Sequence, residues 1–125
     1  MGVHIHDLSD PNRSIRANWW QWRPTVELIK SFDLFDEERM DVLSNGFGEF
    51  SADETQTIIS RLEAFISSHL MPGDRLLLDG RVTSVPDDGT FYRTPSEQHQ
   101  NYSADYVWLV NFVAFCKQCE GIYVS

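Results

Sequence analysis

The sequence predicts a small α+β domain, and three observations favour that class. Apolar residues recur at helical spacing in residues 51–70 and 103–118, whereas shorter apolar runs near both ends and in the middle are typical of strands. Helices and strands do not alternate strictly, which disfavours a doubly wound parallel sheet. A length of 125 residues is typical of one domain. We therefore expect residues 1–125 to form a single globular domain, with about four helices packed against a short mixed or antiparallel sheet.

The first thirty residues predict two strands and the start of a helix. Residues Gly2–Leu8 alternate apolar and polar side chains, which predicts a strand, and Asp10–Asn12 has the composition of a turn. Residues Ser14–Trp22 predict a second strand. Pro24 suits the first position of the helix that follows, because its missing N–H has no intrahelical partner there. The apolar stripe of this helix comprises Val26, Leu28, Ile29 and Phe32.

Two helices are predicted in the middle of the chain. Residues Asp36–Leu43 form a short helix with acids in its first turn, and it ends before Asn45 and Gly46. Ser51, followed three residues later by Glu54, has the pattern of a capping box. A longer helix therefore begins here and ends at Pro72.

The last fifty residues predict a hairpin, a helix and a terminal strand. Residues Arg75–Val85 read as a buried strand bent near Gly80, followed by a turn at residues 86–89 and a strand over Thr90–Thr94. Ser103 caps a helix that runs to about Gln118 and has almost no polar face, so we expect it to be the most buried element. Residues Ile122–Val124 add a strand beside the N-terminal one.

The charge of the protein is strongly negative and unevenly distributed. The net charge is −9 at pH 7, which argues against direct nucleic-acid binding, because such contacts use clustered Lys and Arg. We find no apolar run that predicts a signal peptide or a membrane span, and we expect a cytoplasmic protein that does not bind membranes. Most of the negative charge lies in residues 33–54, which contain eight acidic residues and a single basic one, Arg39.

Residues 33–54 are open to two interpretations. A solvated helix face is the simpler one. The other is a docking surface for a basic protein, because opposite charges speed encounter and the neighbouring Phe32, Phe35, Phe47 and Phe50 offer apolar anchors. The acids predicted to contact a partner are Asp33, Asp36, Glu37, Glu38, Asp41 and Glu49. On this interpretation the protein is an acidic binding module, comparable in its physical design to immunity proteins or inhibitors that neutralise cationic toxins.

Tryptophans are concentrated in residues 18–24. Trp19, Trp20 and Trp22 are three of the four in the chain, and Arg23 follows them. Such rings fill a core, or they form an interface or a stacking platform for a ligand. On the predicted strand, Trp20 and Trp22 share one face. We include Trp19, Trp20, Trp22 and Arg23 among the candidate contact residues.

Histidines and cysteines provide weaker signals. His4 and His6 lie two residues apart and therefore on one face of the predicted strand, as in an H-x-H metal pair, but no third ligand is identified. The alternative function is thus a small metal- or ligand-binding protein that uses these histidines and residues Trp19–Arg23. Cys116 and Cys119 form a C-x-x-C in the last turn of a helix, where reactivity is disfavoured, so we expect core cysteines. We predict no cofactor, and no catalytic signature names a reaction.

The pattern Asn-x-Trp-x-Trp-Arg-Pro, which Asn18–Pro24 satisfies, is combined here with a Phe-rich helix near the C-terminus, in residues Phe112–Ile122. In these two segments the chain resembles a scattered set of small uncharacterised bacterial and phage proteins. The resemblance implies a microbial origin and no activity. A purely structural role in an assembly is a third interpretation that the sequence leaves open.

Overall fold

Residues 2–125, which the computed structural model describes, fold into four α-helices and two antiparallel sheets. The strands are β1 (Gly2–Asp7), β2 (Asp10–Asn18), β3 (Gly48–Phe50), β4 (Arg75–Leu77), β5 (Val82–Thr83), β6 (Ser103–Asp105) and β7 (Ile122–Val124). The helices are α1 (Trp19–Ser31), α2 (Glu37–Ser44), α3 (Ala52–His69) and α4 (Tyr106–Lys117), with a 3₁₀ turn η1 at Gln98–Asn101. The α+β prediction is confirmed, although the strands form two sheets instead of one.

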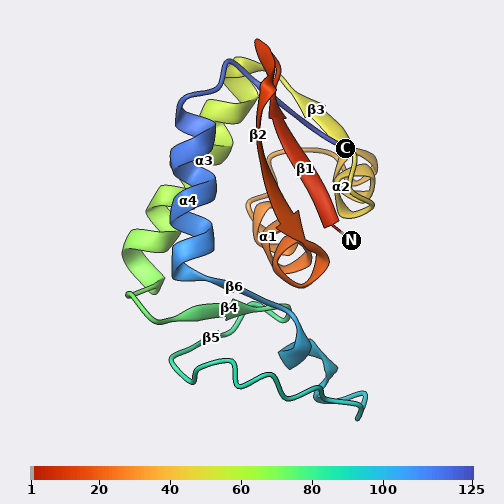
Figure 1. Cartoon of the computed structure of the whole chain (residues 1–125), viewed down its shortest axis with the longest axis vertical. Coiled ribbons are helices and arrows are strands. Elements are labelled where there is room, and N and C mark those ends of the chain that lie inside the picture. The colour runs from red at the N-terminus through yellow and green to blue at the C-terminus, as the bar shows by residue number, and fades with distance from the viewer. Residues whose placement is uncertain (1) are drawn as a thin grey trace.

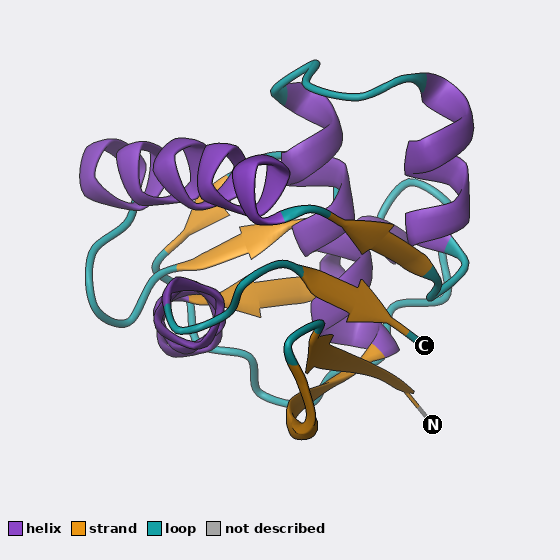
Figure 2. Ribbon diagram, turned by 90° about the horizontal axis from the view of Figure 1, so that it is seen from above, coloured by secondary structure: helices purple, strands orange, loops and turns teal. Residues whose placement is uncertain are grey.

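The larger sheet has the order β2-β1-β7-β3, so β7 lies between β1 and β3. Its pairing with β1 confirms the predicted position of the terminal strand. Ile5 opposes Val124, and Phe50 opposes Ile122. Side chains alternate between the faces of a strand, and the core face of β1 carries Val3 and Ile5. Because β1 and β7 are neighbours, the two ends of the chain lie on the same side of the molecule (Figures 1 and 2).

The smaller sheet has the order β5-β4-β6 and lies at the opposite end of the molecule from β3 (Figure 1). Its hairpin joins β4 to β5 through Asp79 and Gly80, where Gly80 has a φ of +90°. A glycine suits this position, because it adopts a positive φ without the steric cost of a Cβ. The hairpin therefore closes before residues 86–89, and Thr90–Thr94 forms no strand. The hairpin turn and the second strand predicted there are wrong. The third strand of the sheet is β6, which pairs with β4.

Helix α1 begins earlier than predicted. The strand β2 ends at Asn18, whose side chain accepts a hydrogen bond from the backbone N–H of Gln21 at 2.8 Å, while the Gln21 side chain accepts from the Asn18 N–H. This capping box starts the helix at Trp19. The predicted strand over residues 19–22 is therefore wrong, and Pro24 lies in the second turn of α1 instead of at its first position.

The two middle helices are confirmed. Asp36 caps α2, and Ser51 and Glu54 form the predicted capping box of α3. The three-residue strand β3 between them was not predicted.

Helix α4 begins at Tyr106 and is capped by Asp105, because Ser103 belongs to β6. It packs along α3, yet Val107 and Val110 are exposed. The prediction that this helix is the most buried element is wrong, since α1 contributes six buried residues and α4 five.

The core forms where α1 lies between the two sheets. Helix α1 packs on β1 and β2 of the larger sheet and on β6 of the smaller one. Trp22 of α1 meets the edge of Phe112 of α4 at a ring separation of 5.9 Å, and Trp108 stacks on Phe112 at 5.5 Å. The indole N–H of Trp108 also donates to the hydroxyl of Thr25 at 2.9 Å in the interior. These contacts fix the start of α1 and the start of α4 relative to each other.

Candidate functional site

The acids predicted to contact a partner all have exposed side chains. They lie before α2, on α2 and on β3. Glu37 and Glu38 occupy the first turn of α2, where the positive end of the helix dipole favours negative charge. None of the six acids Asp33, Asp36, Glu37, Glu38, Asp41 and Glu49 forms an ion pair with another residue of the described chain.

Helix α2 and the edge strand β3 enclose a surface hollow of about 370 Å³. Asp36 and Glu38 line it from the α2 side, and Glu49 lines it from β3. Val42 also lines it, and Phe47, in the turn between α2 and β3, is 59% exposed. We call these five residues the acidic surface. It combines unpaired carboxylates with two exposed apolar side chains.

Arg39, the single base of this segment, also lines this hollow and is partly exposed, but its guanidinium is engaged by other groups of the fold. Its guanidinium forms an ion pair with Glu54 and donates to the backbone carbonyl of Glu49 at 3.0 Å. It also lies over the rings of Phe35 and Phe50, at 4.6 and 4.7 Å from their centroids. The hydrogen bond from Arg39, followed by the one from the Ser51 N–H, lowers the pKa of Glu54 to about 2. Arg39 therefore neutralises Glu54 and leaves the acidic surface negative.

The tryptophan segment is divided between core and surface. Trp22 is buried, and its indole N–H donates to the Leu43 carbonyl at 3.1 Å, so it is not available to a partner. Trp20 is 45% exposed, and Trp19 is half-buried. The prediction that Trp20 and Trp22 share a face is wrong, because residues two apart on a helix point to different sides.

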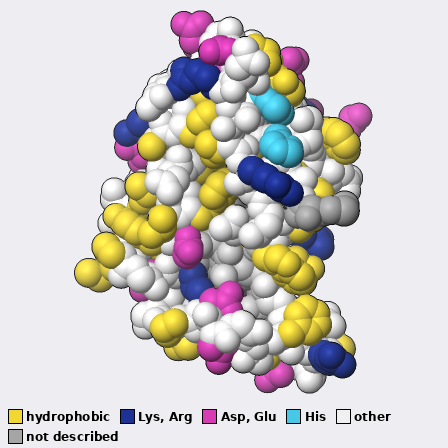
Figure 3. All heavy atoms as spheres, viewed as in Figure 1, with side chains coloured by type: hydrophobic (Ala, Val, Ile, Leu, Met, Phe, Trp, Pro, Cys, Tyr) yellow, Lys and Arg dark blue, Asp and Glu magenta, His cyan; other side chains and the backbone are white. Residues whose placement is uncertain are grey.

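Trp20 belongs to an exposed aromatic cluster. Its ring lies 4.8 Å from that of Tyr102 and 6.0 Å from that of Phe91. Arg23 lies over Tyr102 at 5.4 Å, and a hollow of about 500 Å³ opens between Trp19, Trp20, Arg23 and Tyr102. We call Trp20, Arg23, Phe91 and Tyr102 the aromatic surface. Figure 3 shows hydrophobic side chains over the start of α1 and the loop beneath it.

His4 and His6 lie side by side on the outer face of β1, with ring centroids 6.0 Å apart (Figure 3). His6 stacks on Tyr123 at 4.4 Å and hydrogen-bonds with Ser125 Oγ at 3.1 Å. Within residues 2–125, no cluster of three possible metal ligands is found. The histidine pair is thus left without the third ligand that a metal site requires.

Cys116 and Cys119 are free and buried, which confirms the prediction of core cysteines. Burial raises the pKa of the Cys116 thiol far above its ordinary value, and it raises that of Cys119 to about 11. Neither thiol has the thiolate character that redox chemistry needs.

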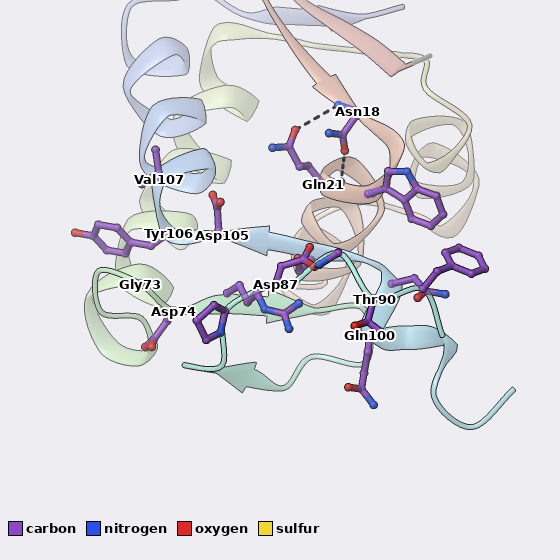
Figure 4. Close-up of a pocket in the computed structure, with 17 residues that line it drawn as sticks. Asn18, Gln21, Gly73, Asp74, Asp87, Thr90, Gln100, Asp105, Tyr106 and Val107 are labelled. Carbon is purple, nitrogen blue, oxygen red and sulfur yellow. Dashed lines mark hydrogen bonds between the residues drawn. The ribbon is translucent and has the colours of Figure 1, made fainter. Parts of the chain in front are cut away.

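Another hollow, of about 620 Å³, lies elsewhere and was not predicted. It is lined by the starts of α1 and α4, by β4 and β6, and by the loop at residues 86–91 (Figure 4). Arg75 of β4 lines it and is only 8% exposed. An arginine at the start of a strand predicted to be buried was the signal in the sequence, because a buried guanidinium requires partners.

The fold and these surfaces define a small acidic α+β protein with an acidic surface, an aromatic surface and an arginine-lined cavity. No protein-family model, no curated protein and no solved structure matches the chain. Among residues 2–125, the helices are too short or too polar to cross a bilayer. The resemblance to small bacterial and phage proteins stays a prediction.

Proposed function

We propose that this protein is a binding module that docks on a basic protein through the acidic surface, as an immunity protein or an inhibitor does. The observation that carries this proposal is the hollow between α2 and β3, which is lined by three carboxylates without ion pairs and by the exposed Val42, with the exposed Phe47 in the turn that joins the two elements. A cytoplasmic location and a microbial source belong to the same proposal.

Each part of the acidic surface has a physical role in such a complex. Unpaired carboxylates attract a basic partner over roughly a Debye length, about 8 Å at physiological salt, and this attraction speeds encounter. Exposed apolar side chains supply affinity once they are desolvated at the centre of an interface. A solvated helix face needs the carboxylates only, so the adjacent Phe47 favours docking over mere solubility.

The test is to capture a partner with the purified protein and to measure the association rate as a function of salt. The test variant neutralises the three carboxylates of the acidic surface and one neighbouring acid of α2, through Asp36→Asn, Glu38→Gln, Glu49→Gln and Asp41→Asn. The matched control carries the same change in charge on other exposed positions, namely Asp10→Asn, Glu27→Gln, Glu97→Gln and Glu120→Gln.

We expect the test variant to associate at least about tenfold more slowly at low salt and to lose most of its salt dependence, whereas the control retains it. The captured protein should be basic. Equal association rates for the two variants would refute the proposal.

The aromatic surface supports a second candidate function, the binding of a ligand at the hollow beside Trp20 and Tyr102. The metal-binding form of this alternative lacks a third ligand within the described chain. The two candidates are distinguished by Trp20→Ala. Loss of the captured partner in this variant, combined with full retention by the neutralised variant, would favour the aromatic surface.

A further inference from the structure

Helix α1 carries two indole rings and a guanidinium on one side of its first two turns. Trp20 and Arg23 are three residues apart, and Trp19 and Arg23 are four apart, which are the spacings that place side chains next to each other on a helix. Trp22 points the other way, into the core, where its N–H donates to the Leu43 carbonyl. This buried contact holds the helix with the other two tryptophans and Arg23 on its outer side.

A hollow of about 500 Å³ lies against this side of α1. Trp20 and Tyr102 line it with ring centroids 4.8 Å apart and planes tilted by 44°, and Ser44 and Asn45 at the end of α2 add a hydroxyl and an amide. The volume lies within the usual range for small-molecule sites, about 300–1,000 Å³. Trp20 is 45% exposed, so its indole has free surface on which a second ring can stack.

Arg23 is the only charged residue among those that line this hollow within residues 2–125. Its guanidinium lies over the ring of Tyr102, 5.4 Å from the centroid, and this stacking orients it. The side chain is exposed and forms no ion pair with another residue of the described chain. Its planar set of N–H donors is therefore accessible to an anion that enters the hollow.

The charges around the hollow determine which ligands fit. Aromatic rings by themselves attract cations, but Arg23 already lies over Tyr102 and would repel a second cation. The net charge of −9 would repel a polyanion such as a nucleic-acid strand. A ligand with one negative charge meets neither obstacle. A carboxylate is such a group, and its planar shape matches a guanidinium through two parallel hydrogen bonds.

We infer that this hollow binds a small planar aromatic carboxylate, whose ring stacks on Trp20 while its carboxylate accepts two hydrogen bonds from the Arg23 guanidinium. The inference rests on the second candidate function, for which it names the class of ligand. Docking through the acidic surface is measured by capture of a basic protein, so that proposal and this one fail in different experiments.

The test is an NMR titration of the folded protein with indoleacetate, tryptamine, cyclohexylacetate and AMP, each to millimolar concentration. Tryptamine replaces the carboxylate of indoleacetate with an amine, cyclohexylacetate replaces the aromatic ring with a saturated one, and AMP replaces the carboxylate with a more highly charged phosphate. We expect indoleacetate to bind and to shift the indole N–H resonance of Trp20. Each other probe should bind at least about tenfold more weakly, because it loses the paired hydrogen bonds or the stacking, or adds charge repulsion.

Three variants connect the binding to the hollow. Arg23→Gln should lower the affinity for indoleacetate about tenfold or more and abolish the preference for indoleacetate over tryptamine. The matched control, Arg16→Gln, removes the same charge from an exposed position of β2 and should bind normally. Trp20→Leu keeps an apolar side chain without the stacking ring and should also weaken binding about tenfold. The changed side chains are exposed, so circular dichroism should show a native fold in all three variants.

Five results would overturn the inference. They are binding of tryptamine as tight as that of indoleacetate, binding of cyclohexylacetate as tight as that of indoleacetate, tighter binding of AMP, an equal loss of affinity in Arg16→Gln and Arg23→Gln, and an unchanged Trp20 resonance with every probe.

Discussion

The ion pair between Arg39 and Glu54 predicts that stability depends on pH in a defined window. Glu54 also completes the capping box of α3, so its charge supports both the start of that helix and the position of Arg39 over the rings of Phe35 and Phe50. The perturbation we consider is Glu54→Gln, which keeps the size of the side chain and removes its charge.

The magnitude follows from the pKa of Glu54, which is lowered from an ordinary value of 4.5 to about 2. That difference corresponds to about 3 kcal/mol before screening. About a third of each side chain is exposed, namely 35% for Arg39 and 33% for Glu54. Solvent screening therefore reduces the expected contribution to about 1–2 kcal/mol.

The sign is set by the direction of the pKa shift. Because the carboxyl is more acidic in the folded protein, its stabilisation is complete above about pH 4.5 and is lost as the pH falls toward 2. We expect Glu54→Gln to lower the free energy of unfolding by about 1–2 kcal/mol at pH 7 and to differ progressively less from the wild type below pH 4.5.

The assay is urea unfolding followed by circular dichroism across this pH range. Glu63→Gln is the matched control, because Glu63 pairs with the exposed Lys117 and should change stability by less than about 0.5 kcal/mol. A loss for Glu54→Gln that is the same at pH 7 and pH 3 would refute the assignment to ionisation. No loss at pH 7 would refute the ion pair itself.

Three further predictions concern the packing of the fold. Thr25→Val should lower the free energy of unfolding by about 1–3 kcal/mol, because it removes the acceptor of the buried Trp108 N–H. The same change should cost little in a Trp108→Phe background, which lacks that donor. Urea unfolding of the single and double variants tests this, and equal costs in the two backgrounds would contradict the coupling. Gly121→Ala should destabilise the protein more than Gly73→Ala does. A Cβ at position 121 would meet other atoms at 2.7 and 2.8 Å, whereas a Cβ at position 73 meets open space. Thermal denaturation compares the two variants, and similar melting temperatures would count against the close contact. Cys119, whose pKa burial raises to about 11, should react with a thiol reagent at pH 8 only after unfolding, and rapid labelling of the native protein would show that it is accessible.

Where local signals agreed with the final environment, the elements were predictable from the sequence. Helix α3 combines a capping box with apolar residues at helical spacing, and its observed start after Ser51 follows from those two features. The short helix α2 and the strand β7 were found in the same way. None of these required knowledge of distant contacts.

The start of α1 was missed because two local signals competed. Three tryptophans in four residues favour a strand, since aromatic side chains are enriched there. Asn18 followed by Gln21 is a capping pattern, and the structure shows that this signal prevails. The consequence for function is large, because it buries Trp22 and leaves Trp20 on the surface.

The candidate sites were predictable only in part. The exposure of the acids follows from their charge, but the hollow beside Glu49 exists because β3 pairs with β7, a contact that joins residues more than seventy positions apart. The aromatic surface likewise brings Trp20 together with Tyr102. Such proximities depend on chain topology and leave no local pattern in the sequence.

The place of β7 in the larger sheet affects how the protein reaches its native state. This strand fills the gap between β1 and β3, so until Val124 has emerged from the ribosome both of those strands have an unpaired edge. Contacts of such long sequence separation make folding slow, and open strand edges favour aggregation while they persist. We therefore expect the sheet to close only after synthesis has passed residue 124.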